Sequence, residues 1–204
     1  YTNWMKNFNE SYFFHRTVKI WNVNNHTSGS GLEDATSIQF FPEGGDLVNG
    51  IHSKVGFKAI GADGLGKEVA GKIIDDQTNA VAEFKSNFLG MGVFTFVPMA
   101  GKKYTARVND VAQSWDLPTP KSEGVVLSVT NQPEQAELTV RIQTTDYKRL
   151  QSLYLLGQSR GMVAFSAKIL LTSNLVYTKI KKDQLREGVT QITVVDAEGL
   201  PLCE

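Results

Sequence analysis

The chain has 204 residues, and its 21 basic and 21 acidic side chains give a formal net charge of zero. This balance argues against a nucleic-acid binder, which normally carries a basic excess, so we expect no nucleic-acid partner. No window approaches the ~20 apolar residues that a membrane-spanning helix needs, so we expect no transmembrane segment. At roughly 100–150 residues per domain, the length predicts one large or two small domains.

The chain has a single cysteine, Cys203, beside its last residue. One thiol can form neither an internal disulfide nor a zinc cluster. This usage fits a cytosolic protein or a bacterial envelope protein without disulfides, and it disfavours a small disulfide-built secreted domain.

The first part of the chain predicts two strands followed by a linker. Between Tyr12 and Ile20, apolar side chains alternate with polar ones, which is typical of a half-buried strand. Because two strands alone are marginal in water, we interpret residues 1–21 as strands that belong to a preceding module. Residues 22–35 are polar and rich in Asn, Ser and Gly, which is the composition of a linker.

Residues 36–117 predict a complete β-sandwich. Apolar side chains alternate along several short segments, for example at Val55, Phe57 and Ala59. Turn-forming residues separate these segments, and short strands at ~8–12-residue spacing are typical of sandwiches and barrels. The short connections favour antiparallel pairing, because parallel strands need a long crossover.

Residues 118–204 predict a second sandwich. Pro118 and Pro120 form a linker before it, since proline cannot donate to a sheet ladder. Residues 150–158 fit either a helical stripe or a strand, and Gly157 with the short length favours the strand. The final apolar run breaks off at the end of the sequence, so we expect this module to be truncated and the natural chain to continue.

Further elements are expected within this second module. Residues 125–129 and 138–142 alternate as strands do, and residues 182–186 fit a single helical turn. Additional strands are predicted at residues 162–168, 174–180 and 188–196. The fold class is therefore all-β, with tandem immunoglobulin-like antiparallel β-sandwiches.

The histidines and the acidic residues offer little for a metal site. His15, His26 and His52 are scattered, whereas metal ligands usually include a close pair, so we expect ordinary surface or interface residues. Asp75 and Asp76 do not match the spacing of a calcium loop, even with Glu83 nearby, and a solvated turn is the better interpretation.

Two motifs superficially suggest catalysis or phosphate binding. Residues 61–67, Gly-Ala-Asp-Gly-Leu-Gly-Lys, lack the Ser or Thr and the helix of a phosphate loop, so a hairpin turn is favoured. Ser159 has no Gly-x-Ser-x-Gly elbow around it, although a triad assembled in space stays possible. Asn9 and Asn25 open glycosylation-type triplets, a short motif that is frequent by chance. We therefore predict no catalytic, cofactor-binding or metal-binding residue, no cofactor and no enzymatic activity.

The tryptophans Trp4, Trp21 and Trp115 could line a sugar or protein groove. Aromatic rings are also what domain junctions bury, and all three lie near the proposed boundaries. Packing at junctions is therefore the favoured interpretation, and a carbohydrate-binding surface is the alternative.

An ordered set of motifs resembles a known family. Residues 40–50 read Phe-Phe-Pro-Glu-Gly-Gly-Asp-Leu-Val-Asn-Gly, residues 55–59 read Val-Gly-Phe-Lys-Ala, and residues 90–92 and 101–104 read Gly-Met-Gly and Gly-Lys-Lys-Tyr. This series resembles macroglobulin-type domains. More narrowly, it resembles large bacterial envelope proteins in which several such domains stand before a TonB-dependent receptor plug-like or carboxypeptidase-regulatory-like domain.

Flanking segments extend the resemblance to nearly the whole chain outside the linker. Residues 2–8 with 12–14 resemble the closing strands of one macroglobulin domain, and residues 185–193 with 201–203 resemble the end of the next. The Cys-Gly-Glu-Gln run of thioester-containing macroglobulins is absent from the sequence, and so is the plug-like domain.

The resemblance implies a non-enzymatic structural and interaction segment of a bacterial cell-envelope protein, periplasmic or outer-membrane associated. Its partners would be envelope proteins or neighbouring domains of the same chain, and its oligomeric state stays open. Two alternatives remain: a carbohydrate-binding module of a polysaccharide-utilisation system, and a hydrolase whose site is assembled across strands.

Overall fold

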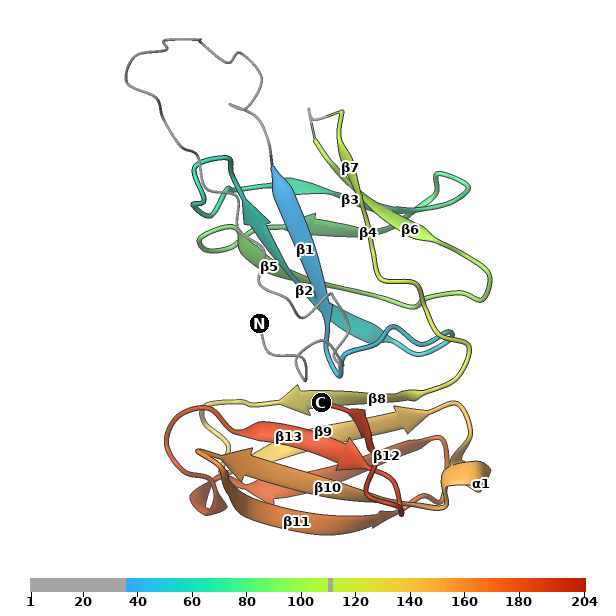
Figure 1. Ribbon diagram of the computed structural model, residues 1–204, viewed down its shortest axis with the longest axis vertical. Coiled ribbons are helices and arrows are strands. Elements are labelled where there is room, and N and C mark those ends of the chain that lie inside the picture. The colour runs from blue at the N-terminus through green and yellow to red at the C-terminus, as the bar shows by residue number, and fades with distance from the viewer. Residues whose placement is uncertain (1–35, 110–111) are drawn as a thin grey trace, which may run out of the picture. The chain divides into compact units, whose positions relative to one another are not determined.

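The computed structural model describes residues 36–109 and 112–204. The predictions for residues 1–21 and 22–35, including Trp4, Trp21 and both upstream histidines, lie outside these described residues. The described chain is all-β and forms tandem immunoglobulin-like antiparallel sandwiches, as the sequence predicts (Figure 1).

The first sandwich packs a three-stranded sheet on a four-stranded sheet. The smaller sheet has the order β1-β2-β5, and the larger has the order β4-β3-β6-β7. All of its ladders are antiparallel. Its strands are β1 (Ser37–Pro42), β2 (Ser53–Ile60), β3 (Ala70–Asp75), β4 (Ala80–Lys85), β5 (Met91–Phe96), β6 (Tyr104–Val108) and β7 (Ser114–Asp116).

The second sandwich repeats this arrangement. Its three-stranded sheet has the order β12-β9-β8, and its four-stranded sheet has the order β11-β10-β13-β14. Its strands are β8 (Val125–Thr130), β9 (Glu137–Thr144), β10 (Ser152–Ser159), β11 (Met162–Leu170), β12 (Leu175–Lys181), β13 (Gln191–Val195) and β14 (Pro201–Cys203). Counting from β8 as the first strand gives the same neighbour pairs as in the first sandwich, so the two modules share one topology.

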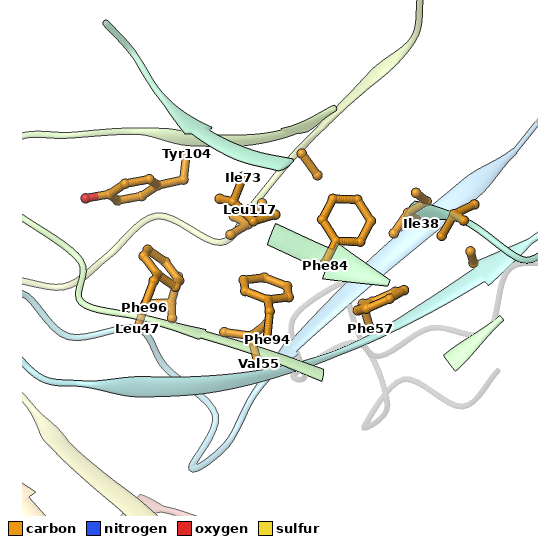
Figure 2. Close-up of a cluster of buried hydrophobic side chains, with 13 residues drawn as sticks. Ile38, Leu47, Val55, Phe57, Ile73, Phe84, Phe94, Phe96, Tyr104 and Leu117 are labelled. Carbon is orange, nitrogen blue, oxygen red and sulfur yellow. The ribbon is translucent and has the colours of Figure 1, made fainter. Parts of the chain in front are cut away.

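The first core is built largely from aromatic rings. Phe94 lies near the rings of Phe57, Phe84 and Phe96, at centroid distances of 6.3, 6.1 and 6.0 Å. Figure 2 shows these side chains between the two sheets. They come from every second residue of their strands, because alternate side chains point to the same face of a sheet. The apolar residues of the period-2 pattern that predicted this sandwich thus form its buried face.

The second core is aliphatic. Its most deeply buried side chains include Val140, Ile142, Leu153, Leu155 and Val194. The 150–158 segment, which fitted either a helix or a strand, is strand β10 over most of its length. A one-turn helix, α1 (Tyr147–Leu150), precedes it and is capped by the Asp146 carboxylate, which accepts from two backbone N–H groups. The predicted helical turn at 182–186 is the 3₁₀ turn η3 (Lys182–Gln184).

The proposed boundary between residues 117 and 118 falls between β7 and β8, and Asp34–Glu204 form one compact unit.

The connection between β1 and β2 contacts the second sandwich. Val48 and Ile51 from this connection form a small buried cluster with Val126 of β8. This contact explains why Val126 is buried, although alternation assigns it to the face opposite Val125 and Leu127. The segment after β7 is also fixed, because Lys121 exchanges backbone hydrogen bonds with the same connection.

Candidate functional site

A hollow of about 540 Å³ lies mainly in the second sandwich, and Glu43 and Gly44 of the β1–β2 connection are also among its lining residues. Its apolar wall comes from Leu127, Val129, Leu138, Leu185 and Ile192. Charged side chains lie around this wall: Glu43, Lys182, Arg186, Glu187 and Glu204. Leu127, Leu138 and Ile192 are at most 9% exposed, so most of this apolar wall belongs to the core of the second sandwich.

The hollow carries no catalytic constellation that we recognise. Among its lining residues there is neither a histidine nor a cysteine, and Thr190 is the one hydroxyl-bearing side chain. Several lining residues belong to the 185–193 segment that carried part of the resemblance. A second, more polar hollow of about 610 Å³ lies at residues 135–137 and 181–183.

The acidic turn of the first sandwich differs from its prediction as a solvated turn. Asp75 is only 5% exposed. Its carboxylate accepts hydrogen bonds from the backbone N–H groups of Gln77 and Asn79, and it forms an ion pair with Lys102. The expectation of a solvated Asp75 is therefore wrong, because a cation 27 residues away compensates its burial.

The contact between Lys102 and Asp75 also shifts the pKa of the Asp75 carboxyl. The hydrogen bond from Lys102 holds the pKa of Asp75 well below its ordinary range, against the opposing effect of burial. Its neighbour Asp76 is exposed. The Glu83 carboxylate lies 3.7 Å from the Lys72 ammonium nitrogen, so these two form an ion pair. Within the described residues, no group of three or more His, Cys, Asp or Glu side chains could hold a metal ion.

The phosphate-loop-like motif is a turn between β2 and β3. The Gly61 N–H donates to the Leu65 carbonyl, and the Leu65 N–H donates to the Asp63 carboxylate. Lys67 donates to the Thr36 hydroxyl at 3.0 Å. A strand rather than a helix follows, so the phosphate-binding geometry does not form here.

The remaining candidates have structural partners. His52 is exposed and its carbonyl accepts from Arg141 at 2.7 Å. Ser159 is buried and its hydroxyl donates to the Val189 carbonyl. Trp115 lies on β7 and packs against the first core rather than in the Val48–Ile51–Val126 cluster. Cys203 is a free, buried thiol, and burial raises its pKa to about 12.

An exposed apolar row on the β1-β2-β5 sheet was not anticipated from the sequence. Phe41 and Val93 both pair with Gly56, which carries no side chain between them. Their exposed fractions are 54% and 53%, and Met91 is also exposed on β5. The signal was present in residues 91–94, where Met-Gly-Val-Phe places apolar side chains on both faces of one strand.

Comparisons with known proteins find a likeness among solved structures. No family model matches the chain, and no curated protein matches it. Among solved structures, the chain is similar to the native conformation of E. coli alpha-2-macroglobulin, with a TM-score of 0.30 and 13% sequence identity. The match covers 82% of this chain and 14% of that chain. No helix of the described residues is long and apolar enough to cross a membrane.

Proposed function

We propose that this chain is a non-enzymatic structural and interaction segment of a bacterial cell-envelope protein related to alpha-2-macroglobulin-like and TonB-dependent uptake proteins. It would act in the periplasm or at the outer membrane. Its partners would be envelope proteins or neighbouring domains of its own chain.

The observation that carries this proposal is the position of the 40–50 motif. Residues 40–42 of the motif end β1, and the rest belongs to the β1–β2 connection, where Val48 packs against Val126 of β8. A motif that serves the packing of one module on the next fits a chain of spacer modules. The residues singled out as possible catalytic groups, in contrast, have structural partners where they are described.

The surfaces available for interaction are the exposed apolar row at Phe41 and Val93 and the hollow of the second sandwich, whose charged lining includes Lys182 and Arg186. An apolar patch that stays exposed in an otherwise packed sandwich is a typical protein-binding surface. We expect these surfaces to contact either a partner protein or a further module.

The proposal is tested by crosslinking and affinity capture, with the purified chain added to extracts of bacterial envelopes. We expect defined envelope proteins to be recovered, and recovery to fall when Phe41 and Val93 are both replaced by Ser. A matched control replaces Leu200, an exposed apolar residue of the β13–β14 turn, by Ser. The proposal is contradicted if no envelope protein is captured, or if all three versions recover the same proteins equally.

A carbohydrate-binding module is separated from this proposal by titrating tryptophan fluorescence with oligosaccharides. Trp115 packs against the first core, so we expect no saturable change from this residue. A saturable response with millimolar or tighter affinity would favour the carbohydrate-binding alternative.

A further inference from the structure

The outward edge of β8 is covered by the turn that follows β1. β8 is the last strand in the order β12-β9-β8, so one side of its backbone has no strand partner in that sheet. The Val129 N–H on this side donates to the Glu43 carboxylate at 3.0 Å. The other carboxylate oxygen of Glu43 accepts from the Ser128 hydroxyl at 2.9 Å. A side chain of the first sandwich thus takes the place of a neighbouring strand.

Glu43 is held in position from its own side. Lys54 of β2 lies 2.9 Å from the Glu43 carboxylate, and the Glu43 N–H donates to the Lys54 carbonyl at 2.8 Å. The ion pair restrains the carboxylate and the backbone bond holds the Glu43 main chain, so less side-chain entropy remains to be lost on contact with β8. The hydrogen bond to Val129 is charge-assisted, which makes it stronger than one between neutral groups.

Gly44 brings the turn against the β8 backbone. A Cβ atom at this position would lie 2.9 Å from the Leu127 nitrogen and 3.0 Å from the Leu127 oxygen. Gly45, the next residue, has nothing within 4 Å of the corresponding position. Both glycines have positive φ, +87° and +94°, so the two differ in their neighbours rather than in their backbone conformation.

We propose that the Glu43–Gly44 turn is an intramolecular cap on the edge of β8, which fixes the first sandwich to the second. An uncovered strand edge is a site for pairing with another chain, and proteins commonly block it with a charge or a covering loop. Here the cap uses both devices. It also gives the Glu-Gly-Gly run of the 40–50 motif a role beyond that of an ordinary turn.

The cap is tested by amide hydrogen exchange at Val129, measured by NMR on the full chain. In the unchanged protein this amide is protected, because its hydrogen bond goes to Glu43. We expect Gly44→Ala to accelerate its exchange about tenfold or more, the loss expected for one charge-assisted hydrogen bond. Gly45→Ala is the matched control: it introduces the same backbone strain without the contact, and Val129 should keep its protection.

A second pair of variants keeps the test independent of the glycines. Glu43→Ala removes the acceptor and should accelerate Val129 exchange to a similar degree. Glu43→Gln keeps an acceptor oxygen without the charge, so its protection should lie between that of Glu43→Ala and that of the unchanged protein. Amides of β9, at the centre of the same sheet, report whether each variant is folded. The proposal is overturned if Glu43→Ala leaves Val129 exchange unchanged, or if Gly45→Ala accelerates it as much as Gly44→Ala.

Discussion

The two sandwiches share one strand order but bury different side chains. The first packs five aromatic residues into its core, Phe57, Phe84, Phe94, Phe96 and Tyr104. The buried cluster of the second consists of Val, Leu and Ile with the single Cys203. The topology therefore does not depend on a particular core chemistry. It follows from strand alternation and short turns, which are common to both modules.

The largest expected effect comes from removing a ring of the aromatic core. Phe94→Ala would remove four ring contacts and should lower the free energy of unfolding by about 3–5 kcal/mol. Leu155→Ala, at a fully buried site of the second core, should cost about 2–5 kcal/mol. Urea denaturation followed by amide signals from each sandwich measures both. A cost below about 1 kcal/mol for Phe94→Ala would contradict the aromatic packing.

Two glycines on equivalent strands, β3 and β10, should respond differently to Ala. A Cβ at Gly71 would lie 2.0 Å from the Arg107 carbonyl oxygen, which is backbone and cannot move away alone. A Cβ at Gly157 would meet the Phe165 ring, which is a partly buried side chain of an edge strand. We therefore expect Gly71→Ala to destabilise its sandwich more than Gly157→Ala, whose overpacking cost should be about 1–3 kcal/mol. Thermal unfolding of the two variants measures this difference in stability. A larger loss of stability for Gly157→Ala than for Gly71→Ala would contradict the geometry.

Acid should act on the first sandwich through Asp75. The pKa of this carboxyl is lowered by Lys102 from its ordinary value of 3.8, so the stabilisation is complete above pH 3.8. It is lost as the pH falls below that value toward the lowered pKa of the folded state. Asp75→Asn should therefore lower stability at neutral pH and flatten the acid dependence of the first sandwich. Asp76→Asn is the exposed control, and an equal effect of the two substitutions would contradict the buried ion pair.

The smallest expected effect concerns the thiol of the second core. Burial raises the pKa of Cys203 to about 12, so the reactive thiolate is scarce at pH 8. A thiol reagent should react with the folded chain at least about tenfold more slowly than with the urea-unfolded chain. Equal rates in the two states, measured by absorbance of the released reagent, would show that Cys203 is accessible.

Local patterns were sufficient to predict the strands. Val55, Phe57 and Ala59 form the inward face of β2, and Leu138, Val140 and Ile142 form the inward face of β9 in the same way. In both cases the pattern reflects the side-chain period of a strand, which sequence shows directly. The one-turn helix α1 was missed, although Asp146 before it is a typical N-cap residue.

Contacts between distant segments could not be predicted in this way. Asp75 meets Lys102 across 27 residues, and Glu43 meets Val129 across 86 residues. The sequence around Asp75 or Glu43 does not indicate which residue will contact it, because each contact depends on how complete sheets or modules pack. The hollow has the same origin, since its lining comes from residues as far apart as Glu43, Leu127 and Ile192.

The connection between β1 and β2 contacts β8 through Val48, Ile51 and Glu43, so we expect it to fix the two sandwiches to each other. Residual dipolar couplings of backbone amides, measured separately for each sandwich in the full chain, report whether it does. We expect a single alignment tensor to fit the couplings of both sandwiches. Two clearly different tensors would mean that the sandwiches move independently and that the connection does not hold them together.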